Sequence, residues 1–209
     1  EVYNLCQELN DDRIVYLKTP RDLHLPKSFE FAYLHTKGEY VLALGSDDGL
    51  LPWALEILDA VTKTYPEEKV IQWERGFYAW PGFGRQEHQF VVPGEYEKGN
   101  LGLFYRTRDA YLEGVIEQPS NMYLLPMLYI NSCFKRTHLD NLINKTGRLW
   151  DGVCQDIYMG VTTATIYPKI LNMRYPLSIA GMSSGSVGAN ANKGVITNAE
   201  FDKIMAQRK

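Results

Sequence analysis

The sequence contains few cysteines, and their spacing excludes two classes of small protein. Cys6, Cys133 and Cys154 are the three cysteines among 209 residues, and no two of them form a C-x-x-C pair. A disulfide framework needs an even set of cysteines, and a structural zinc site needs paired ligands. The sequence therefore predicts three reduced thiols in a cytoplasmic protein.

The sequence also lacks a basic excess and a long hydrophobic run. Lysine and arginine number 22 against 25 aspartate and glutamate, the net charge is −3, and the basic residues are scattered. Nucleic acid is therefore not an expected partner. The most apolar stretch, 122–130, is too short to cross a membrane, and the chain shows no signal-peptide pattern. We expect a cytoplasmic location, either free or peripheral at a membrane.

Metal-binding histidine patterns are absent as well. The four histidines, of which His138 is the last, show no spacing typical of metal ligands, and we expect all four on the surface.

Hydrophobic residues make up 45% of the chain, which is enough for one domain with a sizeable core. Apolar runs alternate with segments of helical periodicity, which is typical of a layered α/β fold with a mostly parallel sheet flanked by helices. The expected strands are 13–18, 40–44, 69–73 and 128–134. The expected helices are 28–36, 52–65, 109–117, 137–145 and 156–166.

The pattern predicts a single domain, large enough to be catalytic, over residues 1–180. A flexible Gly- and Ser-rich loop and a short helix are expected within 181–209. Because the chain begins with Glu1 inside a helical pattern, we expect the natural N-terminus to lie further upstream.

Two adjacent carboxylates, Asp47 and Asp48, follow directly on the apolar run 40–44. Ligands of open α/β sheets bind outside the carboxyl ends of the strands. Two carboxylates placed there can be neutralised by a hard divalent cation, which in turn binds phosphate oxygens. The same pair could instead form a solvated acidic turn before the next helix, since Asp is favoured near helix starts.

The segment 38–55, GEYVLALGSDDGLLPWAL, resembles a signature of family 2 glycosyltransferases with the GT-A fold. In that signature Gly-Glu-Tyr and an apolar strand precede D-x-D-D, three further residues and a proline. The resemblance implies that Asp47 helps to hold a divalent metal, Mn²⁺ or Mg²⁺, on the donor diphosphate. It also implies that Asp48, Ser46 and Gly45 contribute to the donor site, with Gly45 in place of the first acid.

A second segment, 129–160, resembles the part of the family that closes the acceptor side. There an acidic pair opens a helix, and its second member is the catalytic base. The resemblance implies that Asp156 is this base, while Gln155 replaces the first acid. The secondary candidates are Asp151 and Trp150, which could form a plain turn, and Ser183 and Ser186, which could belong to a closing loop.

The resemblance implies a metal-dependent glycosyltransferase with a GT-A-like fold that lacks its first strand in this chain. Its partners would be a nucleotide-sugar donor and a saccharide, lipid-linked or other hydroxyl acceptor, with inversion expected. The Q-x-x-R-W motif of processive synthases is absent, which favours non-processive transfer. Two alternatives remain open, a nucleotidyltransferase and a non-catalytic nucleotide- or carbohydrate-binding module.

Overall fold

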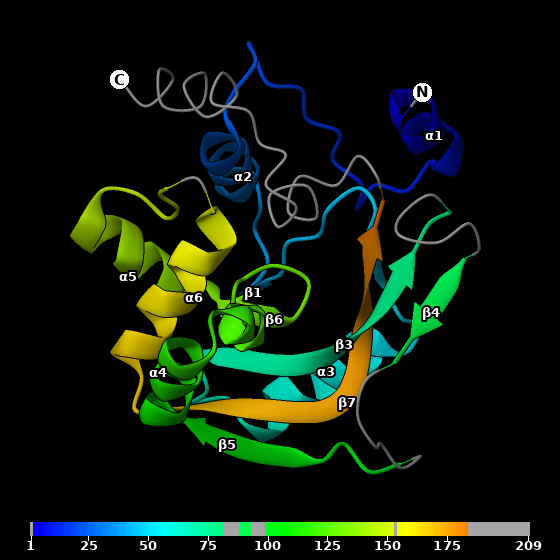
Figure 1. Ribbon diagram of the computed structural model, residues 1–209. Helices are drawn as coiled ribbons and strands as arrows, with labels where there is room; N and C mark the ends of the chain where they lie inside the picture. The colour runs from blue at the N-terminus through cyan, green and yellow to red at the C-terminus, as the bar shows by residue number, and fades with distance from the viewer. Residues whose placement is uncertain (1, 82–87, 93–98, 153, 184–209) are drawn as a thin grey trace.

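The structure is a computed structural model that describes residues 2–81, 88–92, 99–152 and 154–183 (Figure 1). Its helices are α1 Val2–Leu9, α2 Leu25–Leu34, α3 Ala54–Thr64, α4 Arg108–Glu117, the 3₁₀ helix η1 Pro119–Leu124, α5 Arg136–Thr146 and α6 Gln155–Ile166. Its strands are β1 Tyr40–Val41, β2 Gly49–Leu50, β3 Val70–Ala79, β4 Gln89–Val91, β5 Leu103–Thr107, β6 Ser132–Lys135 and β7 Lys169–Met182.

The described strands form one mixed sheet in a single α/β domain. The order is β1-β6-β3-β7-β2, with β4 added to β3 and β5 added to β7. The α/β class is confirmed, but the prediction of a mostly parallel sheet was wrong for the described residues. Among their strand pairings only β3 with β7 is parallel, and the other five are antiparallel. Alternation of helices and strands does not specify which strands become neighbours, and that choice decides their relative direction.

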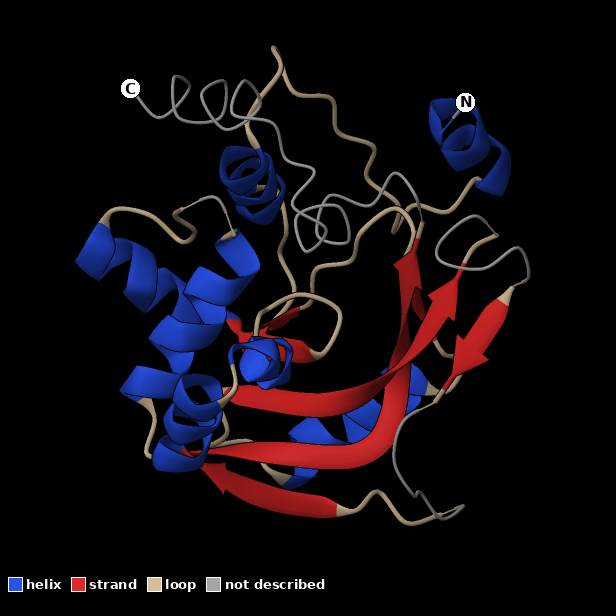
Figure 2. Ribbon diagram, viewed as in Figure 1, coloured by secondary structure: helices blue, strands red, loops and turns tan. Residues whose placement is uncertain are grey.

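The core lies on both faces of β3 and β7. Successive residues of β3 alternate between the faces, as the pleat of a strand requires. Ile71 and Trp73 pack with α3, while Val70 packs with α5 and α6 and Gln72 bonds to Tyr111 of α4. Figure 2 shows α3 behind the sheet, with α4, α5 and α6 gathered at one end of it.

The pairing of β3 with β7 is irregular at the point where both strands bend. Trp73 pairs with Met173, and the next pair is Arg75 with Ser178. The extra residues of β7 include Pro176, and the strand turns sharply here in Figure 1. Such bulges redirect side chains and often lie beside functional sites. This one places Glu74 and Arg75 on the same cavity, although consecutive strand residues normally face opposite ways.

Several local expectations are corrected by the structure. Residues 13–18, expected as a strand, form no strand and are exposed, because no described segment pairs with them. The expected strand 40–44 is shortened to β1. The strand β7 was missed, and it continues through Met182 beyond the expected domain boundary at 180.

The helix expected at 137–145 ends where the sequence predicts. α5 ends at Gly147, whose φ of 73° is the left-handed conformation that favours glycine at this position. The predicted loop and helix in 181–209 lie outside the described residues from 184 on. None of the helices in the described ranges has the length and apolarity needed to cross a bilayer.

Candidate functional site

The acidic turn after β1 is held by the carboxylate of Asp48. One of its oxygens accepts a hydrogen bond from the Gly45 N–H at 2.9 Å, and the other accepts from the Gly181 N–H at 3.0 Å. The Tyr129 hydroxyl also bonds to this carboxylate. Asp48 therefore ties the turn to the end of β7 and to the loop before β6, three segments that are far apart in the sequence.

Gly45 has little space for a side chain. A Cβ atom there would lie 2.7 Å from the Asp48 Oδ2 atom and closer still to the Tyr129 hydroxyl. A side chain at this position would have to displace the ends of the Asp48 and Tyr129 side chains. Gly181 is more restricted, because a Cβ there would overlap the main-chain oxygen of Asp47.

Asp47 and Ser46 complete the turn. Asp47 is half-buried, whereas Ser46 is exposed. The roles of the two carboxylates therefore differ in this structure. Both oxygens of Asp48 accept hydrogen bonds from backbone N–H groups, so this carboxylate fixes the conformation of the turn.

Asp156 lies in the first turn of α6, where the helix dipole favours a carboxylate. The side chain is half-buried and accepts a hydrogen bond from the Ile157 N–H at 2.9 Å. Its neighbour Gln155 is buried, with 6% of its surface exposed. The position at which the resemblance expects another acid is thus packed into the protein interior.

Tyr129 and Arg75 are both affected by the charges of the acidic turn and of Asp156. The pKa of Tyr129 is raised by burial first, then by its hydrogen bond to Asp48 and by the charges of Asp47 and Asp156. The pKa of Arg75 is lowered by burial, and the charges of Asp48 and Asp156 oppose that shift. The two predicted halves of the site therefore act on the same pair of side chains.

The secondary candidates have different surroundings. Asp151 forms an ion pair with Arg148 at 2.9 Å and accepts a hydrogen bond from the Gly152 N–H at 2.7 Å. Trp150 is buried in the core against Phe29 and Tyr33, so its ring does not line the site. 

The two serines of the tail can be placed only in part. Ser183 is half-buried and follows the end of β7, two residues after Gly181. Ser186 lies outside the described residues.

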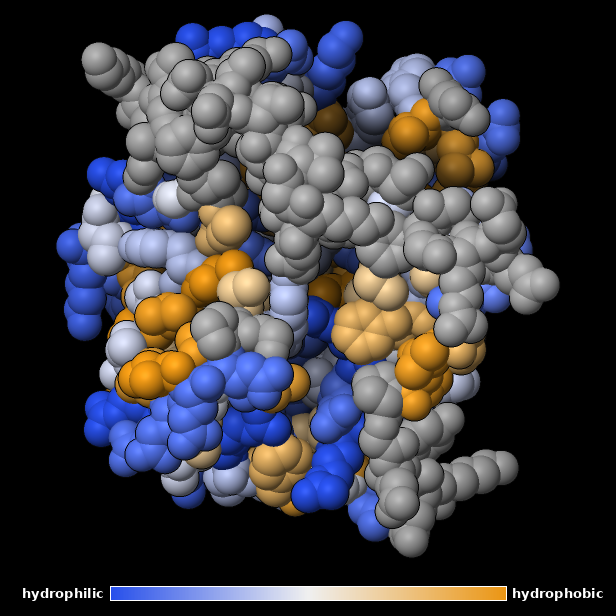
Figure 3. Space-filling model, viewed as in Figure 1, coloured by the Kyte–Doolittle hydropathy of each residue, from blue (hydrophilic) through white to orange (hydrophobic). Residues whose placement is uncertain are grey.

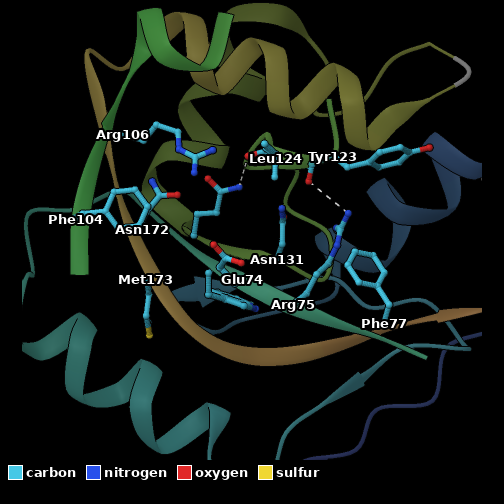
Figure 4. Close-up of a pocket in the computed structure, with 12 residues that line it drawn as sticks. Glu74, Arg75, Phe77, Phe104, Arg106, Tyr123, Leu124, Asn131, Asn172 and Met173 are labelled. Carbon is cyan, nitrogen blue, oxygen red and sulfur yellow. Dashed lines mark hydrogen bonds between the residues drawn. The ribbon is translucent and has the colours of Figure 1, made fainter. Parts of the chain in front are cut away.

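A cavity of about 180 Å³ lies on the side of β3 that η1 covers (Figure 4). Gln72 donates a hydrogen bond to the Leu124 carbonyl at 2.6 Å, and Arg75 donates to the Tyr123 carbonyl at 3.4 Å. The other lining side chains include Glu74, Phe77, Phe104, Arg106, Asn131 and Asn172. Figure 4 shows Glu74 and Asn131 pointing into the space between the sheet and η1.

The surface around this region is mixed in character. Figure 3 shows hydrophobic side chains gathered over α4 and α6 and again beside β3 and β4, with hydrophilic side chains between the two groups. Exposed apolar residues account for both groups, among them Ile116 and Ile166 on one side and Trp80 and Phe90 on the other.

The described residues fit a metal only if a substrate completes its coordination. They contain no group of three or more His, Cys, Asp or Glu side chains that could hold a metal ion. Mg²⁺ is commonly bound by one or two carboxylates together with substrate phosphates. Asp47 fits such a shared site, with Asp48 orienting the turn.

Sequence reasoning missed Arg75 and Tyr129. Arg75 lies outside the strand expected at 69–73, and Tyr129 lies inside the strand expected at 128–134. An arginine close to several aromatic residues was the available signal for Arg75, since charged residues are rarely buried without a partner.

No protein-family model matches the chain, and a search of curated proteins gives no match.

Proposed function

We propose that this chain is a metal-dependent, inverting and non-processive glycosyltransferase that moves a sugar from a nucleotide-diphosphate donor to an acceptor hydroxyl. The observation that supports it best is the convergence of two distant acidic elements. Asp47 and Asp48 follow β1, Asp156 opens α6, and all three charges act on the Tyr129 hydroxyl. Transfer from such a donor needs one acidic group for the diphosphate side and another for the acceptor proton.

In the proposed reaction the acceptor oxygen forms a bond to the anomeric carbon of the donor sugar. The bond from that carbon to the diphosphate oxygen breaks, and its electron pair leaves with the nucleoside diphosphate. The acceptor proton moves to the carboxylate of Asp156, which acts as general base.

The chain's own residues have separate tasks on the donor side. Asp47 would hold a divalent cation, Mn²⁺ or Mg²⁺, which when bound supplies Lewis-acid stabilisation of the departing diphosphate. Asp48 fixes the backbone of the turn through the Gly45 and Gly181 N–H groups. Tyr129 is kept protonated by burial and the neighbouring carboxylates, which raise its pKa, so its hydroxyl remains a donor to Asp48.

The test is thermal unfolding in the presence of a panel of nucleotide-sugars. A ligand that binds the folded state raises the melting temperature by mass action. We expect one donor class to raise it with Mn²⁺ or Mg²⁺ present and to have little effect with EDTA. Asp47→Ala should lose the metal-dependent shift, and a variant that kept it would contradict the assignment of Asp47.

A second candidate function is a nucleotide- or carbohydrate-binding module without turnover. The observation that favours it is the loss of two expected acids, since Gly45 has little room for a side chain and Gln155 is buried. The two functions differ in product. Release of nucleoside diphosphate from a nucleotide-sugar supports a transferase, and binding without release supports the module. Release of pyrophosphate from a nucleoside triphosphate in the presence of a sugar phosphate would instead support a nucleotidyltransferase.

A further inference from the structure

Arg75 is a buried cation that makes few hydrogen bonds to the described residues. Only 9% of its surface is exposed. Within the described ranges its guanidinium makes one hydrogen bond, to the Tyr123 carbonyl at 3.4 Å, and it lies 5.5 Å from the centre of the Phe77 ring. None of the ion pairs within 4.0 Å among the described residues includes Arg75.

The nearby carboxylates form no ion pair with the Arg75 guanidinium among the described residues. Asp48 and Asp156 act on its charge from a distance, and both oxygens of Asp48 already accept backbone hydrogen bonds. A buried charge is costly unless it is paired and hydrogen-bonded. The planar fork of arginine matches a carboxylate or phosphate in a bidentate manner. An anionic group entering the cavity would supply the missing partner.

The cavity can admit part of a sugar unit. A cavity of about 150 Å³ can hold benzene, so the volume of about 180 Å³ beside Arg75 has room for a six-membered ring, with the substituents of a sugar extending out of the cavity. Glu74 lines the same space, is half-buried and forms no ion pair in the described part of the chain, so it can accept hydrogen bonds from hydroxyl groups. Phe77 and Phe104 offer apolar surface to the ring.

The charge balance of the lining favours an anion over a cation. Arg75 and Arg106 face Glu74 across the cavity, so the lining carries one net positive charge. Arg106 stacks on Phe104 and Tyr111, with its guanidinium 5.7 Å and 5.3 Å from the two ring centres. An ammonium-bearing ligand would be attracted by Glu74 but repelled by two guanidinium groups.

We propose that this cavity binds a monosaccharide unit that carries a carboxylate or phosphate group, with the anion on Arg75 and hydroxyl groups on Glu74. Resting on the proposed glycosyltransferase function, this unit is the acceptor. The charge of Asp156 acts on Arg75, so the proposed base and the proposed anion site are coupled electrostatically. The acceptor is then an acidic or phosphorylated sugar rather than a neutral one.

The test is calorimetric titration of the full chain without donor, using glucuronic acid, glucose 6-phosphate, glucose and inorganic phosphate as probes. We expect at least one of the two charged sugars to bind tenfold or more tightly than glucose and than inorganic phosphate. Glucose binding as tightly as both charged sugars would overturn the requirement for an anion. Inorganic phosphate binding as tightly as the charged sugars would overturn the assignment of a sugar.

Single substitutions test whether Arg75 and Glu74 form the sugar site, and circular dichroism checks that each variant is folded. Arg75→Gln should remove the preference for charged sugars. Arg75→Lys keeps a buried cation without the fork and should reduce that preference at least threefold while remaining folded by circular dichroism. Glu74→Gln should weaken all sugars alike. The matched control Arg108→Gln, on a half-exposed arginine of α4, should change nothing. Full preference in folded Arg75→Lys and Arg75→Gln would refute the role of Arg75.

The design separates this inference from the proposed function. Binding of a charged sugar through Arg75, with no nucleoside diphosphate released from any donor, supports the site and refutes the transferase. Transfer to neutral sugars as efficient as transfer to charged ones supports the transferase and refutes the site.

Discussion

Replacing Asp48 by alanine removes three hydrogen bonds that hold the acidic turn. The Gly45 and Gly181 N–H groups and the Tyr129 hydroxyl would all lose their acceptor. Hydrogen bonds to a charged group contribute about 1.5–3 kcal/mol each when fully buried. The turn is half-buried, so water can hydrogen-bond to some of the groups that lose their acceptor. We therefore take the loss of each hydrogen bond to cost about 1 kcal/mol. Relief of repulsion from Asp47 returns at most about 1 kcal/mol, so the free energy of unfolding should fall by ~2 kcal/mol.

Urea unfolding followed by tryptophan fluorescence at neutral pH measures this loss. Asp48→Asn keeps an acceptor oxygen and should lose about half as much. Asp59→Ala is the control, because Asp59 is an exposed carboxylate paired with Lys63 on α3 and such pairs contribute about 0–1 kcal/mol. If Asp48→Ala were as stable as Asp59→Ala, Asp48 would not be the residue that ties the turn to β7 and Tyr129.

Asp156, Gly45 and His138 give three further expectations. Asp156→Asn should lower the rate of nucleoside diphosphate release by about 10²–10⁴-fold, with donor affinity nearly unchanged. Asp151→Asn should lower this rate less. If Asp151→Asn lowered it more than Asp156→Asn, the general base would be Asp151. Gly45→Ala should cost about 1–3 kcal/mol in urea unfolding because of overpacking against Tyr129, and a neutral result would show that the turn can relax. Burial lowers the pKa of His138 from 6.5 to about 4, so the folded state stays neutral where the unfolded state gains a proton. Stability should therefore fall by up to ~3 kcal/mol as the pH drops from about 6.5 to 4, and His138→Gln should flatten this dependence in thermal unfolding.

The helices were the part of the fold that the sequence could predict. The expected helices 109–117, 137–145 and 156–166 match α4, α5 and α6 to within a residue or two, because their signals are local. The strands depended on distant partners. β7 contains Arg174 and Pro176 and carries a bulge, so its pattern is broken where it bends. Residues 13–18 have strand-like composition but no described partner, and remain exposed without pairing.

The acidic residues of the candidate site could be proposed from the sequence, whereas the groups between them could not. Asp47, Asp48 and Asp156 are each marked by a local pattern, namely the end of an apolar run or the start of a helix. Tyr129 and His138 carry no such mark. His138 was expected on the surface, but it is buried against Phe134 and Tyr167, and that follows only from how α5 packs.

Arg75 shows how the bulge and the acidic residues combine into one electrostatic arrangement. Gly45 and Gln155 stand where the glycosyltransferase pattern has acids, and packing crowds the first position and buries the second. The same region gains the buried guanidinium of Arg75, turned toward the cavity by the irregular pairing of β3 with β7. Each of these differences makes the site more positive than the pattern implies. A more positive site suits substrates with more negative charge than a neutral sugar acceptor and a diphosphate donor bring together. Under the proposed function, Gly45, Gln155 and Arg75 would therefore all favour the acidic acceptor that we propose.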